Sequence, residues 1–399
     1  MDLLEAISIQ TEVSLSLAKQ VMLRHAKHSN SVFSPFSIHI LLNLITSGAK
    51  GPTLDELLSY LKSNSNEDLN SLSSQVIALV FDAVGDPRFG PNLSLANAAW
   101  IDQSLSLKSS FKHVVEDVYK ASCNQVDFQT KAVEITGQVN AWAEKETKGL
   151  IKEILPPGSV DSSSDQLILT NALYFKGTWT EKFRASQTKD RDFYLVNGNS
   201  VKVPFMTNCE NQYLSAFDDF KVLGLPYEQG QDERSFSMYI FLPNSKEEGG
   251  LTALVEKLNS QPPGFLDRHL PYRKTRVGEF LIPRFKISFG FEASEVLKEL
   301  GLISPFTEGG GLTEMVDDSS IGKELYISKI FHKSFVQVNE KGTVAAAASA
   351  FCPVKVSLTV IDDDPIDFVA DHPFLFIIRE DQTTGVILFI GQVFNPLED

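Results

Sequence analysis

The sequence has few cysteines, no long apolar run and little excess of positive charge. Its 399 residues contain three cysteines, Cys123, Cys209 and Cys352, which are too few and too scattered to form a disulfide framework. No apolar run approaches the ~18 residues of a membrane span, and the first residues lack the basic start and apolar block of a signal peptide. We therefore expect a cytoplasmic protein without a membrane partner, with release from the cell as the alternative.

The charge balance argues against nucleic acid as a partner. Lys and Arg total 36 against 51 Asp and Glu, which gives a net charge of −15, so the chain repels phosphate backbones and we expect no nucleic acid partner. The densest basic run, RHLPYRKTR, contains Arg268, Arg273, Lys274 and Arg276. It could bind a polyanion, but a solvated strand edge is the simpler interpretation.

Catalytic motifs are missing as well. The chain contains no G-x-S-x-G elbow, P-loop, dinucleotide fingerprint or H-E-x-x-H motif. His25 and His28 could share a helix face but have no nearby third metal ligand, and the acidic run 362–364 lacks the spacing of a calcium loop. We expect no enzyme, no metal and no cofactor, although a triad assembled from distant residues would leave no local motif.

The elements that are present indicate an α+β fold. Hydrophobic residues make up 43% of the chain, which is ample for a large core. Apolar spacing predicts a helix around residues 13–22, one from Thr53 with a capping box to Glu56, one from Val133 to about Gly149, and a short one at 294–300. Runs rich in β-forming residues, several of them alternating, predict strands at 166–175, 236–243, 280–289 and 334–339, and a final hairpin whose turn is 381–384.

One segment is suited neither to a helix nor to a strand. GTVAAAASAFCPVKVS, residues 342–357, opens with strong helix formers and continues into β-branched residues and Pro353. A helix would end at the proline, and a strand would begin with residues of poor β propensity.

At VNEKGTVAAAASA the chain resembles the serpins, a family of serine protease inhibitors, and the resemblance covers nearly the whole chain. SNSVFSPFSIHILL, LTNALYFKGTW, LTEMV, DHPFLFII and FIGQVFNP are similar to further family motifs, and NAAWID and VLGLPY look most like plant serpins. The resemblance implies one domain over 1–399, with three β-sheets, about nine helices and an exposed reactive-centre loop at about 340–364. It also implies a monomer.

The resemblance implies that the chain inhibits a protease as a suicide substrate. The protease cuts the loop and becomes acylated, and the loop then inserts into the main sheet and traps the covalent complex. The hinge of this movement would be Glu340, Gly342, Thr343, Ala345, Ala346, Ala347, Ala348 and Ser349. Small side chains pass between packed strands with little steric conflict, which explains the odd segment.

Two residues in or near the hinge depart from the family pattern, so a non-inhibitory function remains an alternative. Val344 stands where the family usually has glutamate, and Pro353 cannot donate to a strand ladder. A non-inhibitory serpin, acting as a carrier, chaperone or storage protein, is the alternative function, although such serpins tend to have bulky or charged hinges.

The resemblance also implies a polar network beneath the opening strands, called the shutter. Its members would be Ser34, Ser37, Asn171 and His332, with Trp179 nearby on the strand that carries Asn171. Such a network can hold strands together and still release them. The alternative is a satisfied polar cluster in the core without a special role.

The family spacing places the reactive bond at Val356–Ser357, seventeen residues from Glu340 counted inclusively. Valine before the cut suits a shallow, apolar, elastase-like pocket. The rival bond, Lys355–Val356, would suit a trypsin-like serine protease or a papain-like cysteine protease. Because Cys352 lies in the predicted exposed loop, we expect it to be the most accessible thiol.

Overall fold

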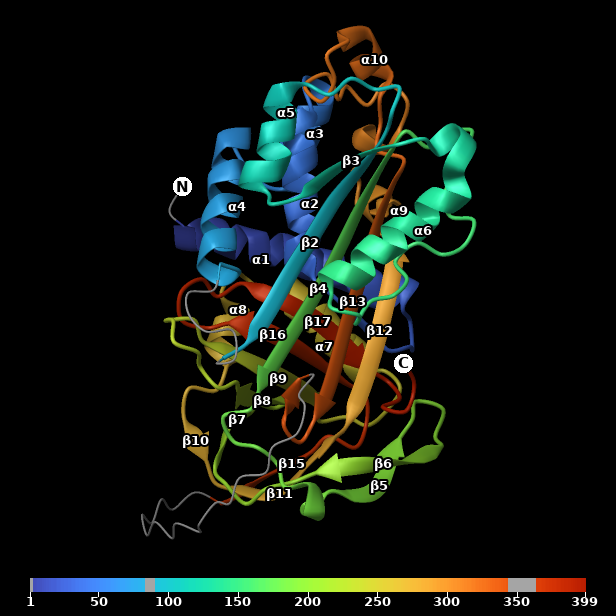
Figure 1. Cartoon of the computed structure of the whole chain (residues 1–399). Helices are drawn as coiled ribbons and strands as arrows, with labels where there is room; N and C mark the ends of the chain where they lie inside the picture. Colours follow the sequence, from blue (N-terminus) through green and yellow to red (C-terminus); the bar gives the residue numbers. More distant parts are fainter. Residues whose placement is uncertain (1–2, 83–89, 344–363) are drawn as a thin grey trace.

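The computed structural model describes residues 3–82, 90–343 and 364–399, and these residues form ten α-helices and three β-sheets (Figure 1). The helices are α1 (Leu3–Gln20), α2 (Pro35–Gly48), α3 (Pro52–Tyr60), α4 (Asn66–Val80), α5 (Ser109–His113), α6 (Phe128–Glu146), α7 (Gly250–Ser260), α8 (Phe265–His269), α9 (Ala293–Glu299) and α10 (Ser319–Glu324). Single π-helical turns follow α1 and α5, at Val21–His25 and Val114–Val118, and 3-10 turns lie at Ala185–Gln187 and Ser304–Phe306.

The largest sheet by strand number has the order β1-β17-β16-β9-β8-β7-β10. Its strands are β1 (Ser31–Phe33), β7 (Gln212–Ala216), β8 (Phe220–Pro226), β9 (Phe236–Pro243), β10 (Lys274–Thr275), β16 (Phe374–Glu380) and β17 (Ile387–Val393). A four-stranded sheet has the order β15-β11-β6-β5, built from β5 (Lys189–Tyr194), β6 (Ser200–Met206), β11 (Val277–Pro283) and β15 (Ile366–Val369).

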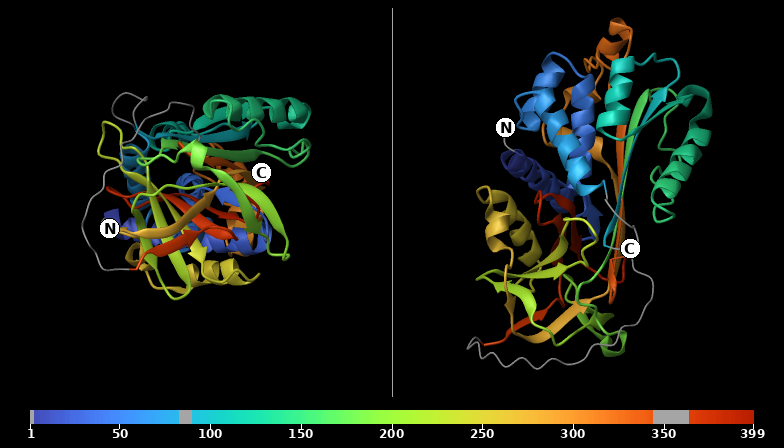
Figure 2. Two further views of the ribbon diagram at one scale, coloured as in Figure 1. Left: turned by 90° about the horizontal axis from the view of Figure 1, so that it is seen from below. Right: turned by 60° about the vertical axis from the view of Figure 1, so that its left-hand side comes forward.

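The third sheet, which we call the main sheet, contains the long strands and positions the site. Its order is β12-β13-β14-β4-β2-β3, from β2 (Asn92–Asp102), β3 (Ser122–Val126), β4 (Leu167–Thr178), β12 (Phe285–Glu292), β13 (Lys329–Asn339) and β14 (Gly342–Thr343). Helix α6 lies across its outer face, and the seven-stranded sheet and α2 lie behind it (Figures 1 and 2).

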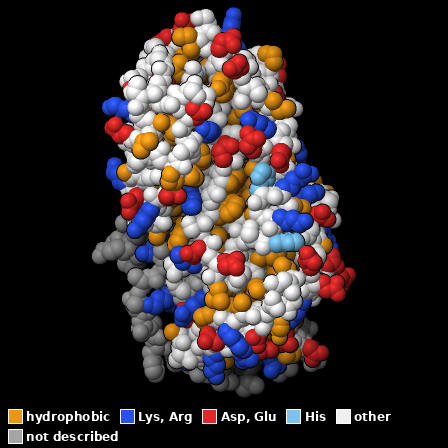
Figure 3. Space-filling view, turned by 90° about the vertical axis from the view of Figure 1, so that its right-hand side faces the viewer, with side chains coloured by type: hydrophobic (Ala, Val, Ile, Leu, Met, Phe, Trp, Pro, Cys, Tyr) orange, Lys and Arg blue, Asp and Glu red, His pale blue; other side chains and the backbone are white. Residues whose placement is uncertain are grey.

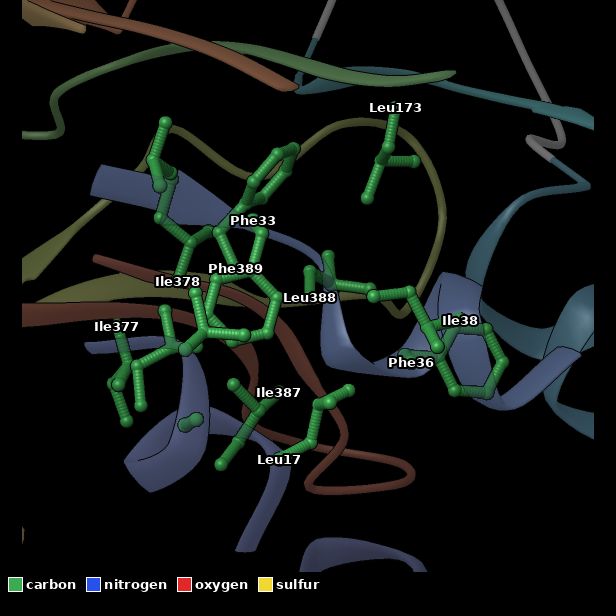
Figure 4. Packing of buried hydrophobic residues seen from close by; sticks show 14 of the residues in the cluster. Leu17, Phe33, Phe36, Ile38, Leu173, Ile377, Ile378, Ile387, Leu388 and Phe389 are labelled. Atoms are coloured by element: carbon green, nitrogen blue, oxygen red, sulfur yellow. The ribbon is translucent and has the colours of Figure 1, made fainter. Parts of the chain in front are cut away.

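Strand β4 is buried on both faces of the main sheet. Ile168 and Ala172 pack with Trp100 and with residues of α6, whereas Leu173 and Phe175 belong to the large inner core. Figure 4 shows Leu173 near Phe33 and Phe36, above the core side chains of β16 and β17. A strand covered on both faces loses the apolar–polar alternation, which is why LILTNALYF is apolar at every position except Thr170 and Asn171.

Several predicted elements are confirmed. Strand 236–243 is β9, strand 166–175 overlaps β4 from Leu167 on, strand 334–339 lies within β13, and helix 294–300 corresponds to α9. The final hairpin is also present, since β16 and β17 pair antiparallel around the turn at 381–384. The α+β class with three sheets is therefore confirmed, with ten α-helices in the described part of the chain where about nine were expected.

Three local predictions need correction. The predicted strand 280–289 is two strands, because the chain leaves the four-stranded sheet at Pro283 and joins the main sheet at Phe285. The capping box from Thr53 to Glu56 is wrong: Gly51 is the N-cap of α3, and the Glu56 carboxylate accepts from the Ile303 and Ser304 amides. The helix expected to start at Val133 starts at Phe128, where Asp127 caps it.

The surface carries charges of both signs. On the face shown in Figure 3, Lys and Arg side chains are interspersed with Asp and Glu. None of the helices in the described ranges is long and apolar enough to cross a membrane. The same ranges contain no group of three or more His, Cys, Asp or Glu residues arranged to hold a metal ion.

Candidate functional site

Strands β4 and β13 pair directly over part of their length and are separated by another strand at one end. They pair in parallel from Ile168–Lys329 to Tyr174–Phe335. Beyond these pairs the two-residue strand β14 lies between them and pairs antiparallel with both. Residues 340–343 were predicted as the start of an exposed loop, but Glu340, Gly342 and Thr343 are buried.

Gly342 fits the narrow gap between these strands because it has no side chain. Its backbone has a φ of 151°, a conformation that L residues rarely adopt. A Cβ atom there would lie 1.9 Å from the Gly177 carbonyl oxygen and 2.7 Å from the Thr178 Cα. The position therefore accepts glycine alone without moving β4.

Thr343 is fully buried and faces the core. Its hydroxyl is 2.7 Å from the hydroxyl of Tyr227, and the Tyr227 ring stacks on Trp179 with a centroid distance of 4.5 Å. The Trp179 indole nitrogen donates to the Asn339 carbonyl at 2.9 Å, and the Trp179 amide donates to the Lys341 carbonyl at 2.8 Å. Trp179 thus holds the turn between β13 and β14, away from the shutter residues.

Glu340 fixes the same turn through its charge. Its carboxylate accepts from Thr188 Oγ1 at 2.6 Å and forms an ion pair with Arg284. Burial opposes the charge, but the hydrogen bonds from Arg284 and Thr188 outweigh it and hold the pKa of Glu340 below its ordinary value. Its backbone carbonyl also accepts from the Phe183 amide at 2.9 Å.

The four predicted shutter residues, Ser34, Ser37, Asn171 and His332, lie together beneath the centre of the main sheet. Asn171 of β4 lies directly opposite His332 of β13 on one side and Asn97 of β2 on the other. Asn171 Nδ2 donates to Asn97 Oδ1 at 2.6 Å, and Asn171 Oδ1 accepts from Ser37 Oγ at 2.6 Å. Three neighbouring strands are therefore joined by one row of polar side chains.

The imidazole of His332 connects this row to helix α2. Its Nδ1 lies 2.6 Å from Asn171 Oδ1, and its Nε2 accepts from the Ser34 amide at 3.1 Å. Since a carbonyl oxygen can only accept and an amide N–H can only donate, Nδ1 carries the proton and Nε2 is bare. The ring is neutral, and Ser334 Oγ makes a third contact with Nε2 at 2.8 Å.

Ser34 and Ser37 reach the sheet because they begin α2. Ser34 is the N-cap of this helix, and its Oγ accepts from the Ser37 amide at 3.1 Å, an arrangement that satisfies one of the free amides at the helix start. The Ser37 hydroxyl donates either to the Ser34 carbonyl at 3.0 Å or to Asn171. Separating β4 from β13 would therefore disturb both the strand pair and the first turn of α2.

We expect the native state to lose stability in mild acid because of His332. Burial lowers the pKa of this imidazole from 6.5 to about 3. The unfolded chain takes up the proton below pH 6.5 but the folded chain does not, so the free energy of unfolding falls by about 1.4 kcal/mol per pH unit between pH 6.5 and 3. Urea unfolding between pH 7 and 4.5 should show a loss of about 2–3 kcal/mol from this residue.

A His332→Gln variant tests this expectation, because the amide can keep the contacts with Asn171 and Ser34 without titrating. Its stability should change less with pH than that of the wild type. His39, whose pKa burial lowers to about 4, contributes a similar slope in both proteins. The exchange His113→Gln at an exposed position is the control. Parallel pH curves for wild type and His332→Gln would contradict the assignment.

The remaining predicted site residues lie outside the described residues. These are the hinge residues Ala345, Ala346, Ala347, Ala348 and Ser349, the departures Val344 and Pro353, Cys352, and the bond residues Lys355, Val356 and Ser357. Sequence reasoning missed Asn97, Ser334 and Tyr227. Asn97, a polar residue between Ala96 and Ala98 in the buried part of β2, was a signal for the first, whereas nothing local marked Tyr227.

The comparisons with known proteins agree with this geometry. A family model described as "Serpin (serine protease inhibitor)" matches residues 8–396. The chain is 55% identical over 397 residues to Serpin-ZX of Arabidopsis thaliana, and the alignment covers 100% of both chains. It is 52% identical over 404 residues to Serpin-ZXA of Oryza sativa subsp. japonica, and this alignment covers 99% of the present chain and 98% of the relative.

A solved structure provides the third comparison. The structure of Arabidopsis AtSerpin1 in the "native stressed conformation" superimposes with a TM-score of 0.91 at 54% identity, covering 100% of both chains. The sheets, the row of polar residues and the sequence similarity lead to one conclusion: the chain belongs to the serpin family of serine protease inhibitors, and its similar relatives include plant serpins.

Proposed function

We propose that this protein inhibits its target as a suicide substrate, by inserting its cleaved loop into the main sheet between β4 and β13. The observation that carries the proposal is β14, which already occupies this position with Gly342 and Thr343. The inserted strand would continue β14 from Thr343 along β4 toward Ile168, and the direct β4–β13 pairs would separate to admit it.

The register of β14 predicts where each residue of the inserting strand would lie. Thr343 pairs with Gly177 of β4 and Val338 of β13. Continuing this antiparallel register by six residues brings Ser349 between Asn171 and His332. Because alternate residues of a strand face the same side, Ser349 would point toward the core, as Thr343 does. A hydroxyl would then take the place of the direct Asn171–His332 contact.

The same register accounts for the two departures from the family pattern. Val344 would lie beside Lys176 and Gln337, which are exposed and half-buried, so an apolar side chain at that position is tolerated. Pro353 would lie beside Leu167, the first residue of β4, and Ser328, just before β13. A missing N–H at the end of the ladder costs less than one in its interior. We infer that neither residue blocks insertion.

The small hinge residues support inhibition over a non-inhibitory role. In the register above, Ala345 and Ala347 would face the core between Phe175 and Leu173 of β4 and their neighbours on β13. Phe175 and Leu173 are buried in the native sheet, where close packing leaves no room for large additional groups. Alanine requires the least separation of the two strands.

We propose an elastase-like serine protease as the target, with Val356–Ser357 as the reactive bond. An inhibited complex should release a C-terminal peptide on denaturation, and its mass identifies the bond. Cleavage at Val356–Ser357 gives Ser357–Asp399, which has 43 residues, and cleavage at Lys355–Val356 gives 44. We expect the shorter peptide after incubation with an elastase-like enzyme.

The control is the same incubation with trypsin-like and papain-like proteases, with covalent complexes scored after heating in detergent. A 44-residue peptide that starts at Val356 would move the target class to those enzymes. Cleavage of the loop without a covalent complex in any incubation would contradict inhibition itself and favour a carrier, chaperone or storage role.

A further inference from the structure

A cavity of about 240 Å³ lies among the N-terminal helices, away from the β4–β13 site. Residues of α1 and α4 line it, together with His39 of α2 and the segment after α3. About half of its wall is apolar, with side chains from Leu3, Ile9, Leu61, Leu69 and Leu72. A cavity of roughly 150 Å³ is enough for a benzene ring, so this one can hold a ring with a short substituent.

Two buried polar side chains also line this cavity. Gln10 and His39 are 2% and 4% exposed. Gln10 Nε2 donates to Ser14 Oγ at 2.6 Å, which orients the amide, and Gln10 Oε1 has no hydrogen-bond partner among the described residues. Neither ring nitrogen of His39 has a partner in the described part of the chain. Such groups are rare in folded proteins because each loses its bonds to water without replacement.

The needs of these two side chains define the chemistry of a ligand. The Gln10 oxygen requires a donor. Burial lowers the pKa of His39 to about 4, so at neutral pH its ring offers one N–H and one bare nitrogen. A hydroxyl group donates and accepts at once. The three unpaired atoms have almost no exposed surface, so Gln10 and His39 must turn toward the cavity to meet it.

Two charged residues, Lys62 and Asp68, also line the cavity. Lys62 is exposed, and its ammonium donates to Glu12 Oε2 at 2.7 Å. Asp68 belongs to the first turn of α4, where its amide bonds to the Ser65 cap. Both buried side chains, Gln10 and His39, are uncharged at neutral pH. Beside these two side chains a charged ligand would lose its hydration without gaining an opposite charge, because the Lys62 ammonium is already paired with Glu12.

We propose that this cavity is a binding site for a small, uncharged, ring-containing molecule that carries one hydroxyl group, such as an alkylphenol. The ring would pack against the leucines, and the hydroxyl would pair with Gln10 and His39. The cavity is present in the intact protein, so the site can be tested without a protease.

The test is titration of the intact protein with three probes at pH 7, followed by calorimetry and ligand-detected NMR. The probes are 4-ethylphenol, ethylbenzene, which lacks the hydroxyl, and 4-ethylbenzoic acid, which is anionic at this pH. We expect 4-ethylphenol to bind at least tenfold more tightly than ethylbenzene, and the benzoate not to bind. Absence of 4-ethylphenol binding at millimolar concentration would overturn the proposal, and so would equal binding of all three probes.

Two variants locate the site. Ala6→Phe should fill the cavity and abolish binding of 4-ethylphenol, and Leu72→Phe serves the same purpose if the first variant fails to fold, as judged by its melting curve. His39→Leu should reduce the affinity for 4-ethylphenol to that for ethylbenzene, whereas His113→Leu, the same exchange at an exposed position, should have no effect. Undiminished binding in a folded filling variant would refute this location.

Discussion

A Thr343→Arg variant is expected to be cleaved by the target protease as an ordinary substrate, with the yield of covalent complex reduced at least tenfold. Thr343 is fully buried between β4 and β13, with its hydroxyl on Tyr227. An arginine there would be an unpaired buried charge, which costs about 3–5 kcal/mol. Because β14 is already part of the intact sheet, we expect the charge to expel β14 from it, so that insertion must then bury the arginine. A barrier raised by that amount slows insertion by roughly a hundredfold or more, and the acyl-enzyme then has time to hydrolyse.

Thr343→Ser is the matched control, because it keeps the hydroxyl and reduces the volume. It should retain most of the covalent complex. The measurement is the ratio of complex to cleaved inhibitor on a denaturing gel after incubation with a protease that the wild type inhibits. If Thr343→Arg forms as much complex per cleavage as the wild type, insertion at this position is not the mechanism.

Cutting the loop of the wild-type protein is expected to raise its melting temperature. In the intact chain β4 and β13 are joined by a short parallel ladder, from Ile168–Lys329 to Tyr174–Phe335. Insertion would replace it with two antiparallel ladders, and antiparallel pairing is the more stable of the two. A net gain of about 5 kcal/mol would raise the melting temperature of a chain this large by roughly 5–10 °C.

Calorimetry of the intact and nicked proteins measures the difference. The nick is made with a protease that cuts the loop without being inhibited. Nicked Thr343→Arg is the control, since its loop is cut but resists insertion, and it should gain clearly less. An unchanged or lower melting temperature for the nicked wild type would refute the proposal that the native state is metastable.

Sequence patterns predicted the strands that stay in one sheet over their whole length and failed where a partner from another part of the chain sets the boundary. Strand 236–243 pairs on both sides and was found with its correct bounds. The run 280–289 looked like one strand, but Ile282 pairs with Met206 in one sheet and Phe285 with Val338 in another. Pro283 lies at the boundary, and this proline was the local signal of the break.

Local sequence patterns were also insufficient to predict the candidate site. Family resemblance brought Ser34, Ser37, Asn171 and His332 together, and composition alone could not have done so, because these residues are far apart in the sequence. At Glu56 a local pattern predicted a contact that the structure does not contain. Its spacing from Thr53 fits a capping box, yet its carboxylate accepts from the Ser304 amide at 3.1 Å. A long-range partner outcompeted the local one, and no pattern within the helix could reveal that.

The presence of β14 in the intact sheet also bears on the kinetics of insertion. Bringing a free segment between two paired strands normally carries an initiation cost, because the chain must close a loop before any new hydrogen bond forms. Here the turn Glu340–Lys341 is already closed, and Gly342 and Thr343 already pair with both neighbours. If the loop inserts as we propose, initiation has therefore taken place before the protease arrives. Insertion becomes an elongation process that advances one residue pair at a time, so its rate should depend on each successive side chain rather than on a single opening event.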